Sequence, residues 1–267
     1  MKRLSELMSL AGRVALVTGG AGHIGLAMAE ALAELGCQLC LLDRDERTLA
    51  RAKERLSNEL GVRVECVKAD LESEAERARI VSLMDGLFGR TDIMINCAAF
   101  VGDCSLDGWA TSFEEQSLET WRRALEVNLT SVFHLCRLMA PMLRASGSGS
   151  IINVGSIYGV VGPDLGLYQD MSMGNPAAYA ASKGGVVQMT RWLATVLAPE
   201  IRVNCISPGG VHRNQPSEFV ARYSARTPLG RMGSEEDFKG AAAYFASDLS
   251  KYVTGENLMV DGGFTTW

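Results

Sequence analysis

The sequence lacks a surplus of positive charge, and it lacks any long apolar run. Its 267 residues carry 26 Lys and Arg against 31 Asp and Glu, a formal net charge of −5. A nucleic-acid-binding domain is usually basic, so this balance argues against a nucleic-acid partner. No apolar stretch approaches the roughly 18 residues of a membrane span, and the first residues show no signal-peptide pattern. We therefore expect a cytoplasmic protein that contacts neither nucleic acid nor membrane.

Histidine is scarce, and the number of cysteines is odd. The three histidines, His23, His134 and His212, are scattered, which predicts no metal site. Most cysteines lie in apolar stretches, as reduced thiols of a cytosolic protein do. Cys37 and Cys40 form a C-x-x-C pattern, but Cys40 lies in the strand-like run QLCLLD, and side chains three apart on a strand face opposite sides. We expect all the cysteines to be free thiols: Cys37, Cys40, Cys66, Cys97, Cys104, Cys136 and Cys205.

Apolar strand-like runs alternate with helical stretches along the whole chain. Hydrophobic residues make up 47% of the sequence, enough for a substantial core. One long helix is expected over residues 118–143, and another is expected to begin with Asn175 as its cap and Pro176 at its first position. Strands are expected at residues 13–18, 38–43, 63–69, 92–99, 150–156 and 201–209 and in ENLMVDGG near the end. This alternation predicts one doubly wound α/β domain over residues 1–267, with a parallel sheet covered by helices on both faces.

A glycine-rich turn follows the first expected strand. TGGAGHIG, residues 18–25, carries glycines at 19, 20, 22 and 25 and opens a helix. Glycines let the backbone approach a pyrophosphate, and the helix amino terminus faces that anion with free N–H groups. Asp43 ends the second strand 18 residues after Gly25, close to the usual place of a carboxylate that binds the adenosine ribose. Together these features favour a dinucleotide site over an ordinary tight turn.

Charged residues after the second and third strands bear on which dinucleotide binds. A carboxylate at Asp43 repels a 2′-phosphate, which favours NAD over NADP. Arg44 could hold that phosphate, so NADP remains the alternative. Asp70, after the third strand, suits an adenine contact, although it could equally cap the following helix.

The segment PAAYAASKGG places Tyr179 and Lys183 one helical turn apart on the same face. A phenol with its ordinary pKa near 10 exchanges protons poorly at neutral pH. An ammonium about 4 Å from a phenolate attracts it by roughly 4 kcal/mol at an effective dielectric of 20, which makes proton exchange with an alcohol or carbonyl accessible. A tyrosine four residues before a lysine is common, and by itself it usually marks a surface aromatic beside a lysine. In this chain the pair is accompanied by Ser156 at the end of the preceding strand, by the glycine turn and by Asp43.

Together these motifs resemble the classical short-chain dehydrogenase/reductase family over essentially the whole chain. Further matching segments are NCAA at residues 96–99, Asn128 in EVNLTSVF, SPGG and YVTGENLMVDGG. The resemblance implies a single-domain Rossmann fold with about seven strands. It also implies hydride transfer between a nicotinamide and a secondary alcohol or ketone, in a homotetramer or homodimer.

The resemblance implies roles for single residues. Tyr179 would be the general acid and base, Lys183 would assist it and bind the nicotinamide ribose, and Ser156 would hold the substrate oxygen. Asn128 would anchor a water in a proton relay, with a buried asparagine satisfied by the backbone as the alternative. The family usually has N-N-A-G where this chain has Asn96, Cys97, Ala98 and Ala99, so the backbone contact to the adenosine ribose is expected to differ there. The implied cofactor contacts are Gly19, Gly22, His23, Ile24, Gly25, Asp43, Arg44, Asp70, Leu71, Asn96, Ala98, Tyr179, Lys183, Pro208, Gly209 and Val211.

An insertion separates Ser156 from Tyr179. The two residues are 23 positions apart, more than is usual in the family. We expect the insertion loop, residues 157–176, to lie over the substrate and to offer Tyr158 and Tyr168 as contacts. Packing at a subunit contact is the alternative.

A substrate lid is expected over residues 210–232. Between Val211 and Arg231 this segment carries four arginines against one acid, Glu218. Guanidinium groups match phosphate and carboxylate oxygens, so an anionic substrate is favoured, with Arg213 as a contact. The alternative is that the arginines form structural ion pairs.

Three functions remain in competition. The loop SIYGVVGPD and the ending GGFTTW are similar to short-chain dehydrogenases from bacterial clusters that make sialic-acid-like surface sugars. We therefore expect an NAD-dependent enzyme acting on a polar, anionic, sugar-like alcohol such as a sugar phosphate or nucleotide sugar. An NADPH-dependent 3-oxoacyl-thioester reductase is disfavoured by Asp43 and the long polar loop. A cofactor-binding regulatory or partner subunit is disfavoured because Ser156, Tyr179 and Lys183 are all present.

Overall fold

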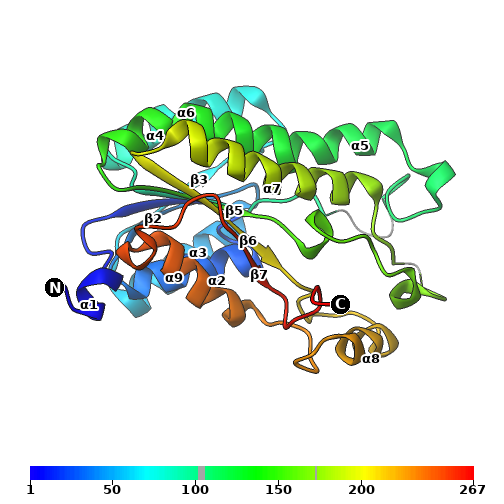
Figure 1. Ribbon diagram of the computed structural model, residues 1–267. Coiled ribbons are helices and arrows are strands. Elements are labelled where there is room, and N and C mark those ends of the chain that lie inside the picture. The colour runs from blue at the N-terminus through cyan, green and yellow to red at the C-terminus, as the bar shows by residue number, and fades with distance from the viewer. Residues whose placement is uncertain (102–105, 172) are drawn as a thin grey trace.

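Seven parallel strands form one sheet in the computed structural model, which describes residues 1–101, 106–171 and 173–267 (Figure 1). The strands are β1 (Val14–Thr18), β2 (Gln38–Asp43), β3 (Val64–Lys68), β4 (Ile93–Asn96), β5 (Gly149–Val154), β6 (Ile201–Pro208) and β7 (Asn257–Val260). Their order is β3-β2-β1-β4-β5-β6-β7, and neighbouring strands are parallel. The predicted doubly wound parallel sheet is confirmed. The strand order reverses between β1 and β4, and in such sheets a ligand crevice opens where the order reverses.

Helices cover both faces of the sheet (Figure 1). One face carries α2 (His23–Glu34), α3 (Glu46–Leu60) and α9 (Lys239–Ala246). The other carries α4 (Glu74–Phe88), α6 (Ser131–Ala145) and α7 (Ala177–Leu197), and α5 (Leu118–Leu125) extends from α6. The short α1 (Leu4–Met8) lies near the N-terminus, and α8 (Ser217–Arg226) lies outside both layers near the C-terminus.

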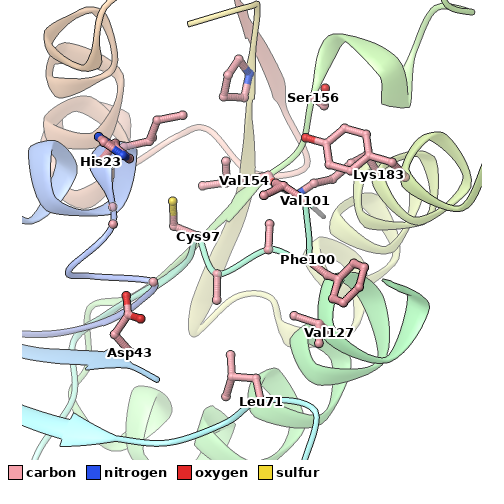
Figure 2. Close-up of a pocket in the computed structure, with 18 of the residues that line it drawn as sticks. His23, Asp43, Leu71, Cys97, Phe100, Val101, Val127, Val154, Ser156 and Lys183 are labelled. Atoms are coloured by element: carbon pink, nitrogen blue, oxygen red, sulfur yellow. Dashed lines mark hydrogen bonds between the residues drawn. The ribbon is translucent and has the colours of Figure 1, made fainter. Parts of the chain in front are cut away.

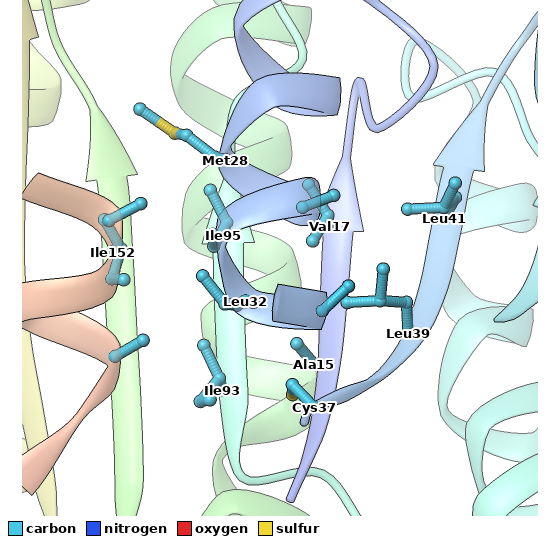
Figure 3. Packing of buried hydrophobic residues seen from close by; sticks show 14 of the residues in the cluster. Ala15, Val17, Met28, Leu32, Cys37, Leu39, Leu41, Ile93, Ile95 and Ile152 are labelled. Carbon is cyan, nitrogen blue, oxygen red and sulfur yellow. The ribbon is translucent and has the colours of Figure 1, made fainter. Parts of the chain in front are cut away.

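Each face of the sheet has its own apolar core. Val17 packs with the α2, α3 and α9 side, whereas its neighbour Leu16 packs with the α4, α6 and α7 side (Figure 3). Adjacent strand residues alternate between faces, and both are apolar because the sheet is covered on both sides. Cys37 and Cys40 fall in opposite cores as predicted, and the described cysteines are free. Cys104 lies outside the described residues.

The predicted long helix contains a π-helical turn. A turn of five residues, Glu126–Thr130, joins α5 to α6, and the whole run ends at Ala145, two residues beyond the predicted end. The N–H of Ser131 donates to the carbonyl of Glu126, five residues earlier. Such turns are rare in proteins, and those that occur are frequently at functional sites. The apolar periodicity of the sequence does not reveal them.

The predicted cap of α7 is wrong. The helix begins at Ala177 with Pro176 as its N-cap residue. Gln116 replaces the expected asparagine cap, because its Oε1 accepts the N–H of Ala177 at 3.0 Å. Both polar atoms of the Asn175 side chain are buried, with no hydrogen-bond partner among the described residues.

The start of β4 is held by a buried carboxylate, and its removal should destabilise the sheet. Asp92 is fully buried and accepts the N–H of Val14 at 2.9 Å and two guanidinium N–H groups of Arg90 at 2.6 and 2.9 Å. Asp92→Ala leaves the Val14 N–H without a partner, which should cost about 2–4 kcal/mol of unfolding free energy. The measurement is thermal and urea unfolding, with Asp85→Ala on the exposed part of α4 as the control. A variant at position 92 that melts within a degree of the wild type contradicts this.

Candidate active site

A cavity of about 430 Å³ follows the carboxyl ends of the strands. The loops after β1 to β6 all contribute to its lining. Figure 2 shows Asp43 and Leu71 toward one end and Ser156 and Lys183 toward the other, with Cys97 and Val154 between them. The volume falls in the range of ordinary ligand sites. This is the edge of the sheet at which the sequence predicts a site.

Most residues proposed as cofactor contacts line this cavity. They are Gly19, Gly22, His23, Ile24, Gly25, Asp43, Arg44, Asp70, Leu71, Ala98, Tyr179, Lys183, Pro208, Gly209 and Val211. Ser156 and Arg213 also line it, whereas Asn96, Asn128, Tyr158 and Tyr168 are not part of the lining. Sequence reasoning had not assigned Leu42, Ala69, Glu72, Cys97, Ala99, Phe100, Val101, Val127, Val154, Gly155 and Gln215 to the site. Most of these residues lie at or just after the end of a strand, so their position in the sequence could have assigned them to the site. Val127 and Gln215 are not at strand ends, and no comparable signal in the sequence marks them.

The glycine turn brings the start of α2 against the end of β4. A Cβ on Gly25 would lie 2.2 Å from the carbonyl oxygen of Gly19, and a Cβ on Gly19 would lie 2.8 Å from the backbone of Ala98. Thr18 accepts the N–H groups of Cys97 and Ala98 at 3.1 and 3.2 Å. The N-cap of α2 is Gly22, which has no side chain to cap the helix. The amino end of α2 therefore keeps donors for an anion in the cavity.

Asp43 is fixed beside this turn. Its Oδ2 accepts the N–H of Ala21 at 3.3 Å, and its Oδ1 accepts the N–H of Arg44 at 2.8 Å. A carboxylate has about four lone-pair sites, so it can still accept hydroxyl groups from a ligand. Arg44 is exposed and also lines the cavity.

Ser156 and Lys183 lie at the opposite end from Asp43 (Figure 2). The hydroxyl oxygen of Ser156 accepts the N–H of Tyr158 at 3.2 Å. Lys183 is 3% exposed, and its Nζ donates to the carbonyl of Val154 at 2.8 Å. The same Nζ lies 5.8 Å from the centre of the Tyr179 ring. The structure thus brings together the serine, tyrosine and lysine that the sequence singles out.

Asn128 lies in the π-helical turn and is almost fully buried. Its Oδ1 accepts the N–H of Phe100 at 2.6 Å. Its Nδ2 donates to the carbonyl of Phe100 and to the hydroxyl of Ser182, both at 3.1 Å. This favours the alternative of a satisfied buried asparagine and leaves the proton relay a prediction. One consequence is that Asn128 fixes Phe100, which lines the cavity.

Comparison with known proteins identifies the family. A family model described as enoyl-(acyl carrier protein) reductase matches residues 19–265. The rhamnolipids biosynthesis 3-oxoacyl-[acyl-carrier-protein] reductase of Pseudomonas aeruginosa is 34% identical, with 96% of this chain and 97% of the relative covered. The chain belongs to the classical short-chain dehydrogenase/reductase family. It is therefore a dehydrogenase or reductase that acts on CH–OH and keto groups.

Solved structures agree with this assignment. The NADPH-dependent 3-quinuclidinone reductase from Rhodotorula rubra superposes with a TM-score of 0.89 at 30% identity, covering 100% of this chain and 96% of the other. A short-chain dehydrogenase from Leptospira borgpetersenii with bound NAD⁺ has a TM-score of 0.84 at 35% identity, covering 99% and 96%.

Two polar residues of this short-chain dehydrogenase/reductase do not behave as the sequence suggests. Asp70 does not cap α4, so that alternative is wrong: the cap is Ser73, whose hydroxyl accepts the N–H of Glu76 at 3.3 Å. Asn96 lies beneath the cavity, where its Nδ2 donates to Oδ1 of Asn153 at 2.9 Å. Its cofactor contact stays a prediction that the lining of the cavity does not support.

A buried arginine links the Asp70 side of the cavity to the π-helical turn. Arg77 is 2% exposed. Its guanidinium donates to the carbonyl of Leu71, to Oε1 of Glu126 at 2.6 Å and to Nδ1 of His134 at 3.2 Å. Leu71 lines the cavity and Glu126 begins the π-helical turn, so Arg77 ties the Asp70 side of the cavity to the turn that holds Asn128.

The arginines of the predicted lid, residues 210–232, already contact other groups of the chain. Arg213 pairs with Glu235 at 3.3 Å, Arg226 with Asp164 at 3.2 Å and Arg231 with Asp237 at 2.7 Å. Arg222 donates to the carbonyl of Gln169 at 2.7 Å. The Arg231 guanidinium holds the pKa of the Asp237 carboxyl well below its usual range. Of the four arginines, Arg213 alone lines the cavity. The structure favours the ion-pair alternative for Arg226 and Arg231, whereas Arg222 is held by a backbone carbonyl.

Residues 1–101, 106–171 and 173–267 hold no group of three or more His, Cys, Asp or Glu side chains placed to bind a metal ion. In the same ranges, no helix combines the length and apolarity that crossing a membrane requires.

Cys97 should be an unreactive thiol although it lines the cavity. Burial raises its pKa to about 11, against a smaller opposing effect of Lys183 and Arg213. At pH 8 such a thiol is about one part in a thousand ionised, whereas an ordinary thiol with a pKa near 8.5 is about a quarter ionised. We expect iodoacetamide to label Cys97 at pH 8 at least twentyfold more slowly in the folded than in the denatured protein, and the rate to rise toward pH 10. Peptide mass spectrometry measures this, and equal rates in both states contradict it.

Proposed function

We propose that the protein transfers a hydride between a nicotinamide cofactor, preferably NAD, and a secondary alcohol or ketone. The observation that carries this proposal is the grouping of Ser156, Tyr179 and Lys183 at one end of a cavity whose other end holds Asp43. A subunit without turnover would have no use for this grouping.

The residues present suit a dinucleotide. The free amino end of α2 and the glycine backbone would hold the pyrophosphate. Asp43 would accept hydroxyls of the adenosine ribose, and Lys183 would donate to the nicotinamide ribose. Pro208 and Gly209 would border the nicotinamide, which when bound accepts or supplies the hydride.

Ser156 and Tyr179 would handle the substrate oxygen. A backbone N–H already donates to the oxygen of Ser156, so the serine's own hydrogen can be donated to the substrate. When an alcohol is oxidised, Tyr179 takes the hydroxyl proton as the C–H bond breaks; in the reverse direction it returns that proton to the oxygen. One N–H of Lys183 is fixed on Val154, which leaves two for other partners and keeps a positive charge near the phenol.

The choice of cofactor depends on Asp43. Its carboxylate disfavours the 2′-phosphate of NADP by charge repulsion. Related structures include an NADPH-dependent enzyme, several NADP complexes and one with bound NAD⁺, so they support a nicotinamide cofactor but not a preference for NAD. The fixed position of Asp43 is therefore the main support for NAD.

We propose a polar, sugar-like alcohol as the substrate. Arg213, which lines the cavity, would contact its phosphate or carboxylate group. Assembly into a homodimer or homotetramer also stays a prediction.

A second candidate is the reduction of 3-oxoacyl thioesters. The Pseudomonas aeruginosa relative, named as a reductase of this kind, favours it. Such an enzyme is expected to prefer NADPH, so the cofactor preference separates the two candidates.

The substitution Tyr179→Phe should abolish turnover and leave cofactor binding intact. It removes only the phenolic hydroxyl, and loss of a general acid and base typically costs 10²–10⁴-fold in rate. We would first identify an alcohol that the wild type oxidises in a panel of polyols, sugar phosphates and nucleotide sugars. We would then compare kcat and NADH fluorescence titrations, with Tyr252→Phe at a fully exposed position as the control. Retention of more than a tenth of kcat would contradict the assignment of Tyr179.

The substitution Asp43→Asn should shift the cofactor preference toward NADPH. The wild type is expected to bind NADH more tightly than NADPH, because the carboxylate accepts ribose hydroxyls and repels a phosphate. The neutral variant should lower the NADH-to-NADPH affinity ratio at least tenfold. Arg44→Ala is the matched control and should leave wild-type NADH affinity within about threefold. A wild type that prefers NADPH and loses this preference in Arg44→Ala would assign the role to Arg44 instead and favour the thioester reductase.

A further inference from the structure

Two tyrosines of the insertion loop form a hydroxyl pair. The phenolic oxygens of Tyr158 and Tyr168 lie 2.5 Å apart. Their surroundings are apolar: Ile157, Leu167, Met171 and Phe219 belong to the same cluster. In such a pair one O–H donates to the other oxygen, so one hydrogen remains to be donated outside the pair.

The lid holds this pair in place. The ring of Tyr168 packs on Phe219 of α8, with ring centres 5.5 Å apart. Arg222 of α8 donates to the carbonyl of Gln169, and Arg226 pairs with Asp164. Both sides of Tyr168 are thus attached to α8, so the insertion loop and the lid helix form one packed unit.

The pair adjoins the reacting end of the cavity through the backbone of Tyr158, although neither tyrosine is part of the cavity lining. Tyr158 donates its backbone N–H to the hydroxyl oxygen of Ser156. Burial raises the pKa of both phenols; the neighbouring Tyr168 raises the pKa of Tyr158 further, whereas the hydrogen bond with Tyr158 partly offsets the effect of burial on the pKa of Tyr168. Both hydroxyls are therefore neutral donors and acceptors at any working pH.

We propose that the Tyr158–Tyr168 pair binds a second oxygen of the substrate, on a carbon close to the one that reacts. A spare O–H in apolar surroundings needs an acceptor, and a hydroxyl or carbonyl oxygen of the substrate supplies one. The substrate class is then a diol or hydroxyketone rather than a simple monoalcohol. This inference rests on the proposed function, because it takes Ser156 to hold the first oxygen.

Ligand binding tests the pair without requiring turnover. The probes are trans-cyclohexane-1,2-diol and cyclohexanol, which share a ring and differ by one hydroxyl. Their affinities for the protein with bound NADH are measured by ligand-observed NMR, for the wild type and for the double variant Tyr158→Phe/Tyr168→Phe. This variant removes both partners of the hydrogen bond, so no orphaned hydroxyl is left, and thermal unfolding verifies its fold. Tyr252→Phe, at a fully exposed position, is the matched control.

We expect the wild type and Tyr252→Phe to bind the diol at least fivefold more tightly than cyclohexanol, and the double variant to bind the two within twofold. Equal affinities in the wild type, binding of neither probe, or a preference that survives in a folded double variant would each overturn the inference. Oxidation of either alcohol by NAD is a separate readout on the wild type. If the wild type binds the diol selectively but oxidises no alcohol, the proposed function is contradicted. The role of the tyrosine pair in binding a second oxygen is then still supported.

Discussion

The site depends on one buried hydroxyl group at the point where the strand order reverses. Thr18 ends β1 and accepts the N–H groups of the two residues that follow β4, Cys97 and Ala98. This contact brings the exits of two neighbouring strands so close that a side chain at Gly19 would meet the backbone of Ala98. The chain after β1 must then turn sharply into α2, and the open amino end of that helix is left facing the cavity.

The sequence predicts those parts of the molecule that depend on neighbours along the chain. Helix α3 shows how local such signals are: the Asp45 side chain caps its first turn, and Gly61 ends it in the left-handed conformation. The same holds for the four-residue spacing of Tyr179 and Lys183 and for the polar residues at strand ends. Local rules therefore account for the layers of the fold and the shared helix face of Tyr179 and Lys183, whereas most of the predicted cavity lining and the role of Ser156 came from the family resemblance.

What the sequence could not predict depends on partners far away along the chain. Arg77 meets Glu126 and His134, and Arg226 meets Asp164, across 49, 57 and 62 positions. Composition shows four arginines in the lid but not the acceptors that neutralise them. The cap of α7 failed for the same reason, because it comes from Gln116 in a distant loop. Each of these contacts follows from the packing of the lid, the loops and the helices, and none from a local pattern.

The ion pair between α8 and the insertion loop neutralises a positive charge that one substitution could expose. Arg226 is neutralised by Asp164, an acid of the chain itself, in the same loop as the tyrosine pair. Replacing Asp164 by a neutral residue would leave the Arg226 guanidinium unpaired with Asp164, and no new basic residue would be needed. Recognition of a negatively charged substrate could therefore arise from the loss of one acidic residue, at a position outside the lining of the cavity.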